Sequence, residues 1–152
     1  METTAREIAA TIIDRCRARG ITDVSNLKLQ KLLYYAQAWN LALTEEPLFS
    51  DTCEAWVHGP VVARVFGEYK SNRWAPISDP LGPIVGDFGI TAHIDSVLEA
   101  YGDLGATQLE RLTHQERPWL EARAGLAPDE PSRNPISMKS MKEFYSSLVA
   151  QS

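Results

Sequence analysis

NLKLQKLLYYAQAWNLAL, residues 26–43, is the stretch that decides the fold of this chain. Apolar side chains recur there at helical spacing and form one stripe: Leu29, Leu32, Leu33, Ala36 and Leu43. Further apolar and aromatic side chains widen that stripe: Leu27, Tyr34, Tyr35, Trp39 and Leu41. A helix that is apolar over most of its circumference is typical of a buried element. The pattern therefore predicts a central helix that other elements contact on several sides.

The segment before this helix predicts a second helix, over residues 4–19. Its apolar side chains are three and four residues apart, which is the spacing of one helical face. Thr4 and Glu7 have the spacing of a capping box, and Gly20 is a stop signal.

The segment after the central helix predicts a short strand and then a helix. Residues 49–58 alternate between apolar and polar side chains, which favours one strand. Gly59 and Pro60 predict the start of a helix to about Ser71, because proline suits the first helical position. Residues 72–90 hold three prolines and several apolar side chains, so they predict an ordered, packed loop.

The second half of the chain predicts only helices and loops. Helical periodicity covers residues 91–102, 106–113 and 118–124. Residues 125–135 predict a surface loop. Ser137 and Ser140 open the last helix, with Ser140 and Glu143 as its expected capping box.

Together these elements predict a mainly α fold for residues 1–152, as a single compact domain. We expect about six or seven helices, with room for one short strand pair. A chain of 152 residues can bury a core without metal or disulfide help. Its hydrophobic fraction of 44% and charged fraction of 23% are ordinary for a globular protein, which excludes a disordered or collagen-like chain.

Charge and cysteine usage restrict the class of partner and the compartment. The net charge of −5 argues against direct contact with nucleic acid, which needs a basic face. Cys16 and Cys53 lie in no paired cysteine motif, so we expect free thiols and no zinc site. The N-terminus has no apolar leader segment, and no apolar run is long enough to span a membrane. The expected compartment is the cytoplasm.

Catalytic motifs are absent from the sequence. The chain has no P-loop, no G-x-G-x-x-G and no G-x-S-x-G, and His58, His93 and His114 share no helical metal-ligand spacing. We therefore expect no catalytic residue, no metal and no cofactor. A hydrolase that uses His114 and Glu116 is the enzymatic alternative; in the other interpretation these polar side chains fasten a helix end near Pro118.

Lysines and aromatic residues offer candidate contacts with a partner. Lys28 and Lys31, with Gln30 between them, predict either a basic face that contacts an acidic partner or a plain solvated surface. Four tryptophans and five tyrosines supply core side chains, and the same residue types dominate the energetics of protein interfaces.

Three blocks of sequence resemble the Panacea domain, the SocA-like antitoxin family. They are LKLQKLLYYAQAW at 27–39, EAWVHGPVV at 54–62 and LTHQERPW at 112–119. The blocks occur in the family's order, and the resemblance extends over roughly residues 5–148. The family often has serine or glycine near residues 105–107, and the resemblance leads us to expect a different cap for that helix here.

The resemblance implies an antitoxin of a type II or type VI-like toxin–antitoxin system, which binds a cognate toxin protein. Family members are paired with unrelated toxins. Some relatives are thought to deliver the toxin to an ATP-dependent protease, and others only mask it. Relatives in prophages imply the alternative function: an interaction or anti-defence module that binds a host protein.

Site residues follow from the motifs and from side-chain type. As partner-contacting residues we expect Lys28, Lys31, Tyr34, Tyr35, Trp56 and His58. As residues of the family motif with a structural role we expect Leu29, Gln30, Leu33, Gly59, Pro60, Val61, Thr113, His114, Glu116 and Trp119. A DNA-binding autorepressor is a further alternative, although the chain has no separate basic helix-turn-helix segment.

Overall fold

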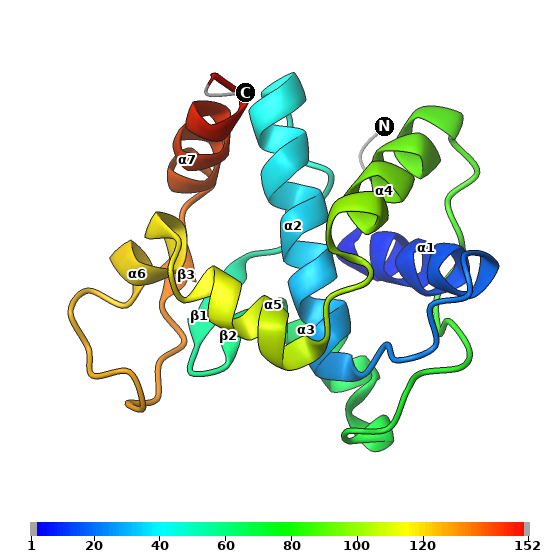
Figure 1. The fold of residues 1–152 in the computed structure, drawn as a ribbon, viewed down its shortest axis with the longest axis horizontal. Helices are drawn as coiled ribbons and strands as arrows, with labels where there is room; N and C mark the ends of the chain where they lie inside the picture. Colours follow the sequence, from blue (N-terminus) through cyan, green and yellow to red (C-terminus); the bar gives the residue numbers. More distant parts are fainter. Residues whose placement is uncertain (1–2, 151–152) are drawn as a thin grey trace.

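The computed structural model describes residues 3–150, and within this range the chain forms seven α-helices and a three-stranded sheet (Figure 1). The elements are α1 (Ala5–Ala18), α2 (Asn26–Thr44), β1 (Cys53–Trp56), β2 (Gly59–Val61), α3 (Ala63–Glu68), the 3₁₀ turn η1 (Lys70–Asn72), α4 (Phe88–Tyr101), α5 (Ala106–Thr113), α6 (Arg117–Ala122), β3 (Pro135–Ile136) and α7 (Met138–Ala150). The predicted mainly α, single-domain fold is confirmed. None of the helices in this range is long and apolar enough to cross a membrane.

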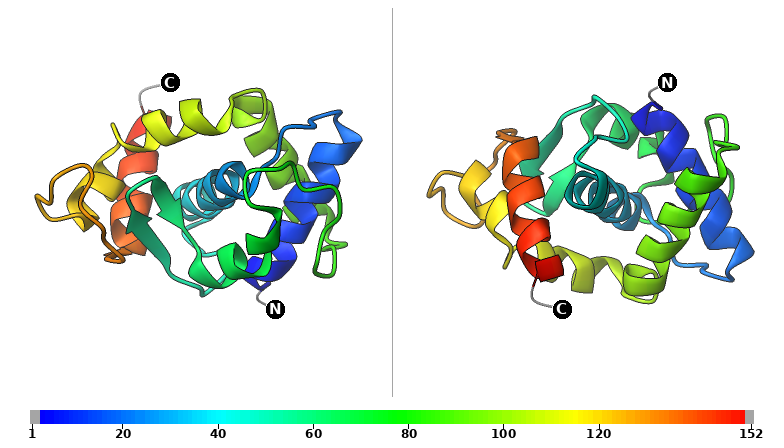
Figure 2. Two further views of the ribbon diagram at one scale, coloured as in Figure 1. Left: turned by 90° about the horizontal axis from the view of Figure 1, so that it is seen from below. Right: turned by 90° about the horizontal axis from the view of Figure 1, so that it is seen from above.

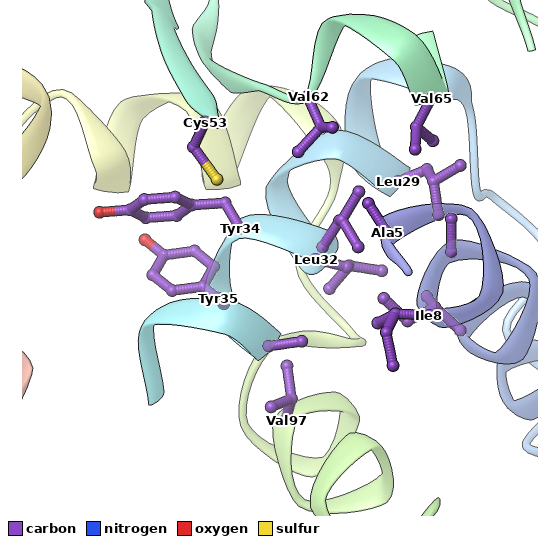
Figure 3. Packing of buried hydrophobic residues seen from close by; sticks show 14 of the residues in the cluster. Ala5, Ile8, Leu29, Leu32, Tyr34, Tyr35, Cys53, Val62, Val65 and Val97 are labelled. Atoms are coloured by element: carbon purple, nitrogen blue, oxygen red, sulfur yellow. The ribbon is translucent and has the colours of Figure 1, made fainter. Parts of the chain in front are cut away.

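Helix α2 lies at the centre of the fold, as its sequence predicts. Seen along its axis, α2 has α7 and the sheet on one side and α1 and α4 on the other (Figure 2). Leu29 and Leu32 are fully buried and lie between α1 and the chain around Val62 and Val65 (Figure 3). Every side of α2 is therefore covered over most of its length.

Short polar side chains fix where the helices begin. The Thr4 hydroxyl accepts a hydrogen bond from the Glu7 amide, and the Glu7 carboxylate accepts one from the Thr4 amide, as the capping box predicts. At the last helix Ser137 caps the N-terminus as expected, but the expected capping box at Ser140 and Glu143 is wrong by about one helical turn. The Ser137 hydroxyl accepts from the Ser140 amide at 2.9 Å, because Ser137 immediately precedes the helix, which begins at Met138. Ser140 lies inside the helix.

The strands form one antiparallel sheet in the order β2-β1-β3. The expected helix start at Gly59 and Pro60 is wrong, since both residues belong to β2 and the helix begins at Ala63. Trp56 pairs with Gly59, so only two residues connect β1 to β2. Gly59 follows this tight turn with φ of 108°, which glycine adopts without strain. Pro60 is tolerated because β2 is an edge strand.

The residues between η1 and α4, 73–87, form an ordered segment across α1 that we call the strap (Figures 1 and 2). Ile77 is buried in the core, and its amide donates to the Val24 carbonyl at 2.7 Å. The Val85 amide donates to the Thr11 hydroxyl of α1 at 2.9 Å. The predicted ordered loop is thus present, but its packing is only partial, because Trp74 is exposed.

Replacement of Leu33 by alanine tests the central position of α2. Leu33 has no exposed surface, so its truncation should lower the free energy of unfolding by about 3 kcal/mol. Leu43 of the same helix is 59% exposed, and Leu43→Ala should change it by less than about 0.5 kcal/mol. Urea denaturation of the two variants measures both values; equal losses would contradict the arrangement.

Candidate interaction site

Buried polar side chains are the main feature of the sequence block that opens α2. Lys28, Gln30, Lys31 and Gln37 have no exposed surface, and the tyrosines Tyr34 and Tyr35 are 1% and 0% exposed. The expectation that Lys28 and Lys31 form a solvent-facing basic surface is therefore wrong. The physical reason is the central position of α2, which leaves its first turns no solvent-facing side. Four of the expected contact residues therefore lie inside the protein: Lys28, Lys31, Tyr34 and Tyr35.

Lys28 and Gln30 fasten neighbouring loops to α2. The Lys28 ammonium donates to the Asp23 carboxylate at 2.7 Å and to the Gly102 carbonyl at 2.8 Å. The Gln30 side-chain oxygen accepts from the Val62 amide at 3.0 Å. A buried donor or acceptor must find such a partner, since leaving it unpaired costs about 1–3 kcal/mol. These side chains thus hold chain segments far apart in sequence against one helix.

Lys31 lies below the turn between β1 and β2. Its ammonium donates to the Pro60 carbonyl at 3.0 Å, and a Cβ at Gly59 would overlap its Cε atom. Complete burial lowers the pKa of Lys31 from its ordinary 10.5 to about 7, although the nearby charge of Glu110 acts in the opposite direction. Gly59 is therefore the residue that leaves room for the lysine.

Three tyrosines and one carboxyl group join α2 to α7. The Glu116 carboxylate accepts hydrogen bonds from Tyr35 and Tyr145, each at 2.8 Å, and the Tyr145 hydroxyl lies 3.1 Å from that of Tyr34. Burial raises the pKa of Glu116, and the two tyrosine hydroxyls partly compensate by donating to it. The cluster positions the last helix on the central one.

The three sequence blocks that carry the family resemblance meet in space. The Trp119 indole N–H donates to the Trp56 carbonyl at 2.9 Å, and the His114 ring stacks on Trp119 with centroids 4.0 Å apart. All ten residues expected to have a structural role are buried, except half-buried His114: Leu29, Gln30, Leu33, Gly59, Pro60, Val61, Thr113, His114, Glu116 and Trp119. The motif therefore forms an interior junction.

His114 and Glu116, the residues of the hydrolase alternative, face different partners. Glu116 is directed at tyrosines of α2 and α7, whereas His114 stacks on Trp119. Burial lowers the pKa of His114. Within residues 3–150 no group of three or more histidine, cysteine, aspartate or glutamate side chains is placed to hold a metal ion.

Only two of the six expected contact residues reach the surface. The His58 side chain is 69% exposed, with its Nδ1 atom 3.1 Å from the Glu110 carboxylate. Trp56 is half-buried, between the Phe66 ring and the guanidinium of Arg133. Both side chains lie at the sheet.

Most of the exposed large apolar side chains belong instead to the strap or to the first residue of α4. Of the seven large hydrophobic residues that are exposed in the described part of the chain, four lie between positions 74 and 88: Trp74, Leu81, Ile84 and Phe88. The prolines and apolar residues of this segment signalled its order. They did not signal which side chains face outward, and none of these four residues was among the expected contact residues.

A shallow apolar depression between α2 and α4 is a further exposed feature. Its lining includes Trp39, Leu43, Val97 and Tyr101, and its volume is about 180 Å³. The Trp39 indole N–H already donates to the Tyr101 hydroxyl at 2.8 Å. Pockets that enclose a small-molecule ligand usually measure about 300–1,000 Å³, so this one is too small for such a role.

The lowered pKa of Lys31 makes stability depend on pH. Between pH 7 and 10.5 the unfolded chain keeps the Lys31 proton while the folded chain releases it. Rising pH therefore favours the folded state in this window. We expect the free energy of unfolding of the wild type to increase between pH 7 and 10 relative to that of Lys31→Met. Lys139→Met, at an exposed position, is the control. Urea denaturation at several pH values measures the difference, and parallel curves for wild type and Lys31→Met would contradict the burial of a titrating amine.

Comparisons with known proteins identify the family of this chain. The model of the family "Antitoxin SocA-like, Panacea domain" matches residues 29–85, from α2 to the strap. Antitoxin SocA of Caulobacter vibrioides (strain NA1000 / CB15N) is 37% identical over 128 residues, which cover 76% of this chain and 68% of that protein. No solved structure matches the chain significantly. On this similarity the chain belongs to the SocA-like Panacea-domain family of antitoxins.

Proposed function

We propose that this protein is an antitoxin that neutralises a protein toxin by binding directly to it, without catalysis. Membership of the antitoxin family supports a partner toxin in general terms. The observation that carries the proposal is the position of the motif residues. They lie in the interior, where they hold α2, the sheet and α6 together, and so the surface performs the function.

A binding protein of this kind needs an ordered surface rather than an active site. Specific protein interfaces bury about 1,600 Å² in total, which is about 800 Å² on each partner. The chain exposes 7,894 Å², so such an interface would cover roughly a tenth of its surface. Its apolar strap is fastened to α1 by hydrogen bonds, which limits the conformational entropy that binding would cost.

A second candidate function is delivery of the bound toxin to an ATP-dependent protease in the cytoplasm. An adaptor must hold two proteins at once and therefore needs two contact surfaces. The two separate exposed features, the strap on α1 and the depression between α2 and α4, favour this candidate. Neither direct neutralisation of the toxin nor its delivery to a protease requires a cofactor or contact with nucleic acid.

A co-expression assay tests the proposed function. The small protein encoded by the gene next to this one is induced in bacteria with and without this chain, and a tag on the chain is used for purification. We expect growth to be restored and the neighbouring protein to co-purify with the chain, because neutralisation is by direct binding.

The other outcomes separate the alternatives. Restored growth with loss of the toxin band, and return of that band in a protease mutant, would show delivery for degradation. Failure to restore growth, with a host protein captured instead, would replace the antitoxin proposal by the prophage-type interaction module.

A further inference from the structure

Trp74 is the most exposed large hydrophobic residue in the part of the chain that the structure describes, with 88% of its surface free. It follows the 3₁₀ turn η1 and Arg73, whose φ of 53° and ψ of −118° place a non-glycine residue in a rarely populated conformation. Such strain costs about 1–3 kcal/mol and is found mostly at functional positions. The backbone therefore turns sharply at the position that directs a tryptophan into solvent.

Hydrogen bonds on both sides hold this turn in place. The Arg73 amide donates to the Lys70 carbonyl at 3.1 Å, and the Ala75 amide donates to the Asn72 carbonyl at 2.9 Å. Pro76 restricts the backbone that follows Trp74. Trp74 is thus presented on an ordered backbone and not on a loose loop.

The rest of the strap is tied to the body of the protein at regular intervals. The Leu81 amide donates to the Tyr69 hydroxyl at 2.9 Å, and the Leu81 carbonyl accepts from Arg6. Pro80 and Pro83 flank this attachment point. A segment ordered before binding pays little entropy when a partner covers it, so its exposed apolar side chains are available for affinity.

The charges beside Trp74 are basic, although the chain as a whole is acidic. Lys70 and Arg73 are exposed, and neither forms an ion pair with any other residue between 3 and 150. Both cations lie within four positions of the exposed indole, in a chain whose net charge is −5. Charge complementarity then requires carboxylates on the surface that faces them.

The depression between α2 and α4 is a weaker candidate for the main contact. Its tryptophan, Trp39, is only half-exposed and is already hydrogen-bonded to Tyr101. Trp74 has its indole ring free for a partner, and tryptophan is among the residues that contribute most to binding when a pocket encloses them.

We propose that Trp74 is the anchor through which this chain holds its toxin, by inserting into an apolar pocket on the toxin whose rim carries carboxylates facing Lys70 and Arg73. The inference rests on the proposed antitoxin function and deepens it by assigning the contact surface and the chemistry of its counterpart.

Affinity measurements on the purified full-length chain and the protein of the neighbouring gene test this inference. Trp74→Ala should weaken binding about 30-fold, the effect of removing a hot-spot side chain. Lys70→Glu combined with Arg73→Glu should weaken it about tenfold at low salt and less at high salt, because exposed charges are screened. Tryptophan fluorescence of the wild type should shift to shorter wavelength on binding, and Trp74→Ala should lose that shift.

Matched controls separate the contact from loss of folding. Leu120→Ala removes another exposed apolar side chain, and Arg111→Glu with Lys139→Glu reverses two charges on α5 and α7. Both controls should bind within twofold of the wild type. Trp74→Ala should keep the circular dichroism spectrum and melting temperature of the wild type, because its side chain is exposed. Arg73→Gly should relieve the strained backbone and keep or raise the melting temperature, yet bind more weakly.

Each remaining outcome overturns the inference in a distinguishable way. If the wild type binds and Trp74→Ala binds within twofold of it, the anchor is wrong and the antitoxin function stands. If the charge-reversal variant binds as well as the wild type or more tightly, the acidic rim is wrong. If the wild type does not bind the neighbouring protein, the anchor and the proposed function fail together.

Discussion

The interaction on which the structure depends is the burial of polar side chains along α2. Lys28, Gln30, Lys31 and Gln37 have no exposed surface, so each must find its hydrogen-bond partner inside the protein. The partners are mostly backbone groups outside α2: Gly102, Val62, Pro60 and, for Gln37, both Leu48 and Phe49. A loop fastened in this way cannot move without leaving a buried charge or amide unpaired. The apolar contacts of α2 hold the helices together, and its polar contacts fix where the connections between them run.

The position of α2 could be predicted from sequence, whereas the direction of its lysines could not. Apolar side chains over most of a helix circumference require cover on several sides, and that argument holds for any such helix. The rule that places lysine outside fails at Lys28 and Lys31, because the carbonyls that accept their hydrogen bonds are distant in sequence. Gly102 lies 74 positions after Lys28, and Pro60 lies 29 positions after Lys31. Local spacing carries no information about such distant acceptors. Gly59 and Pro60 were misassigned for a related reason: the same dipeptide suits a helix start and an edge strand, and pairing with Trp56 decides between them.

At the candidate site, too, the sequence reveals short motifs but not the contacts between residues far apart in the chain. The motif blocks are recognisable in sequence because they contain unusual residue types at fixed spacing, and the structure shows that they meet inside the protein. Gly59 makes room for Lys31, and Trp119 binds the carbonyl of Trp56. An interior junction of this kind holds the scaffold and leaves the exposed positions free to differ. Its sequence therefore identifies the family and gives no indication of which surface a partner covers.

The surface around Trp74 carries a cost that the isolated chain does not need for its own stability. A strained residue at Arg73 and a tryptophan exposed over 88% of its surface both lower the stability or solubility of the free protein. Ile77 and Val85 already attach the strap to the core, so the outward side chains are not required to order it. The exposed indole of Trp74 is unfavourable in the free chain, and its backbone is ordered. A partner that covers the indole explains both properties. Burial of the indole in a complex would recover the hydrophobic free energy that the free protein forgoes.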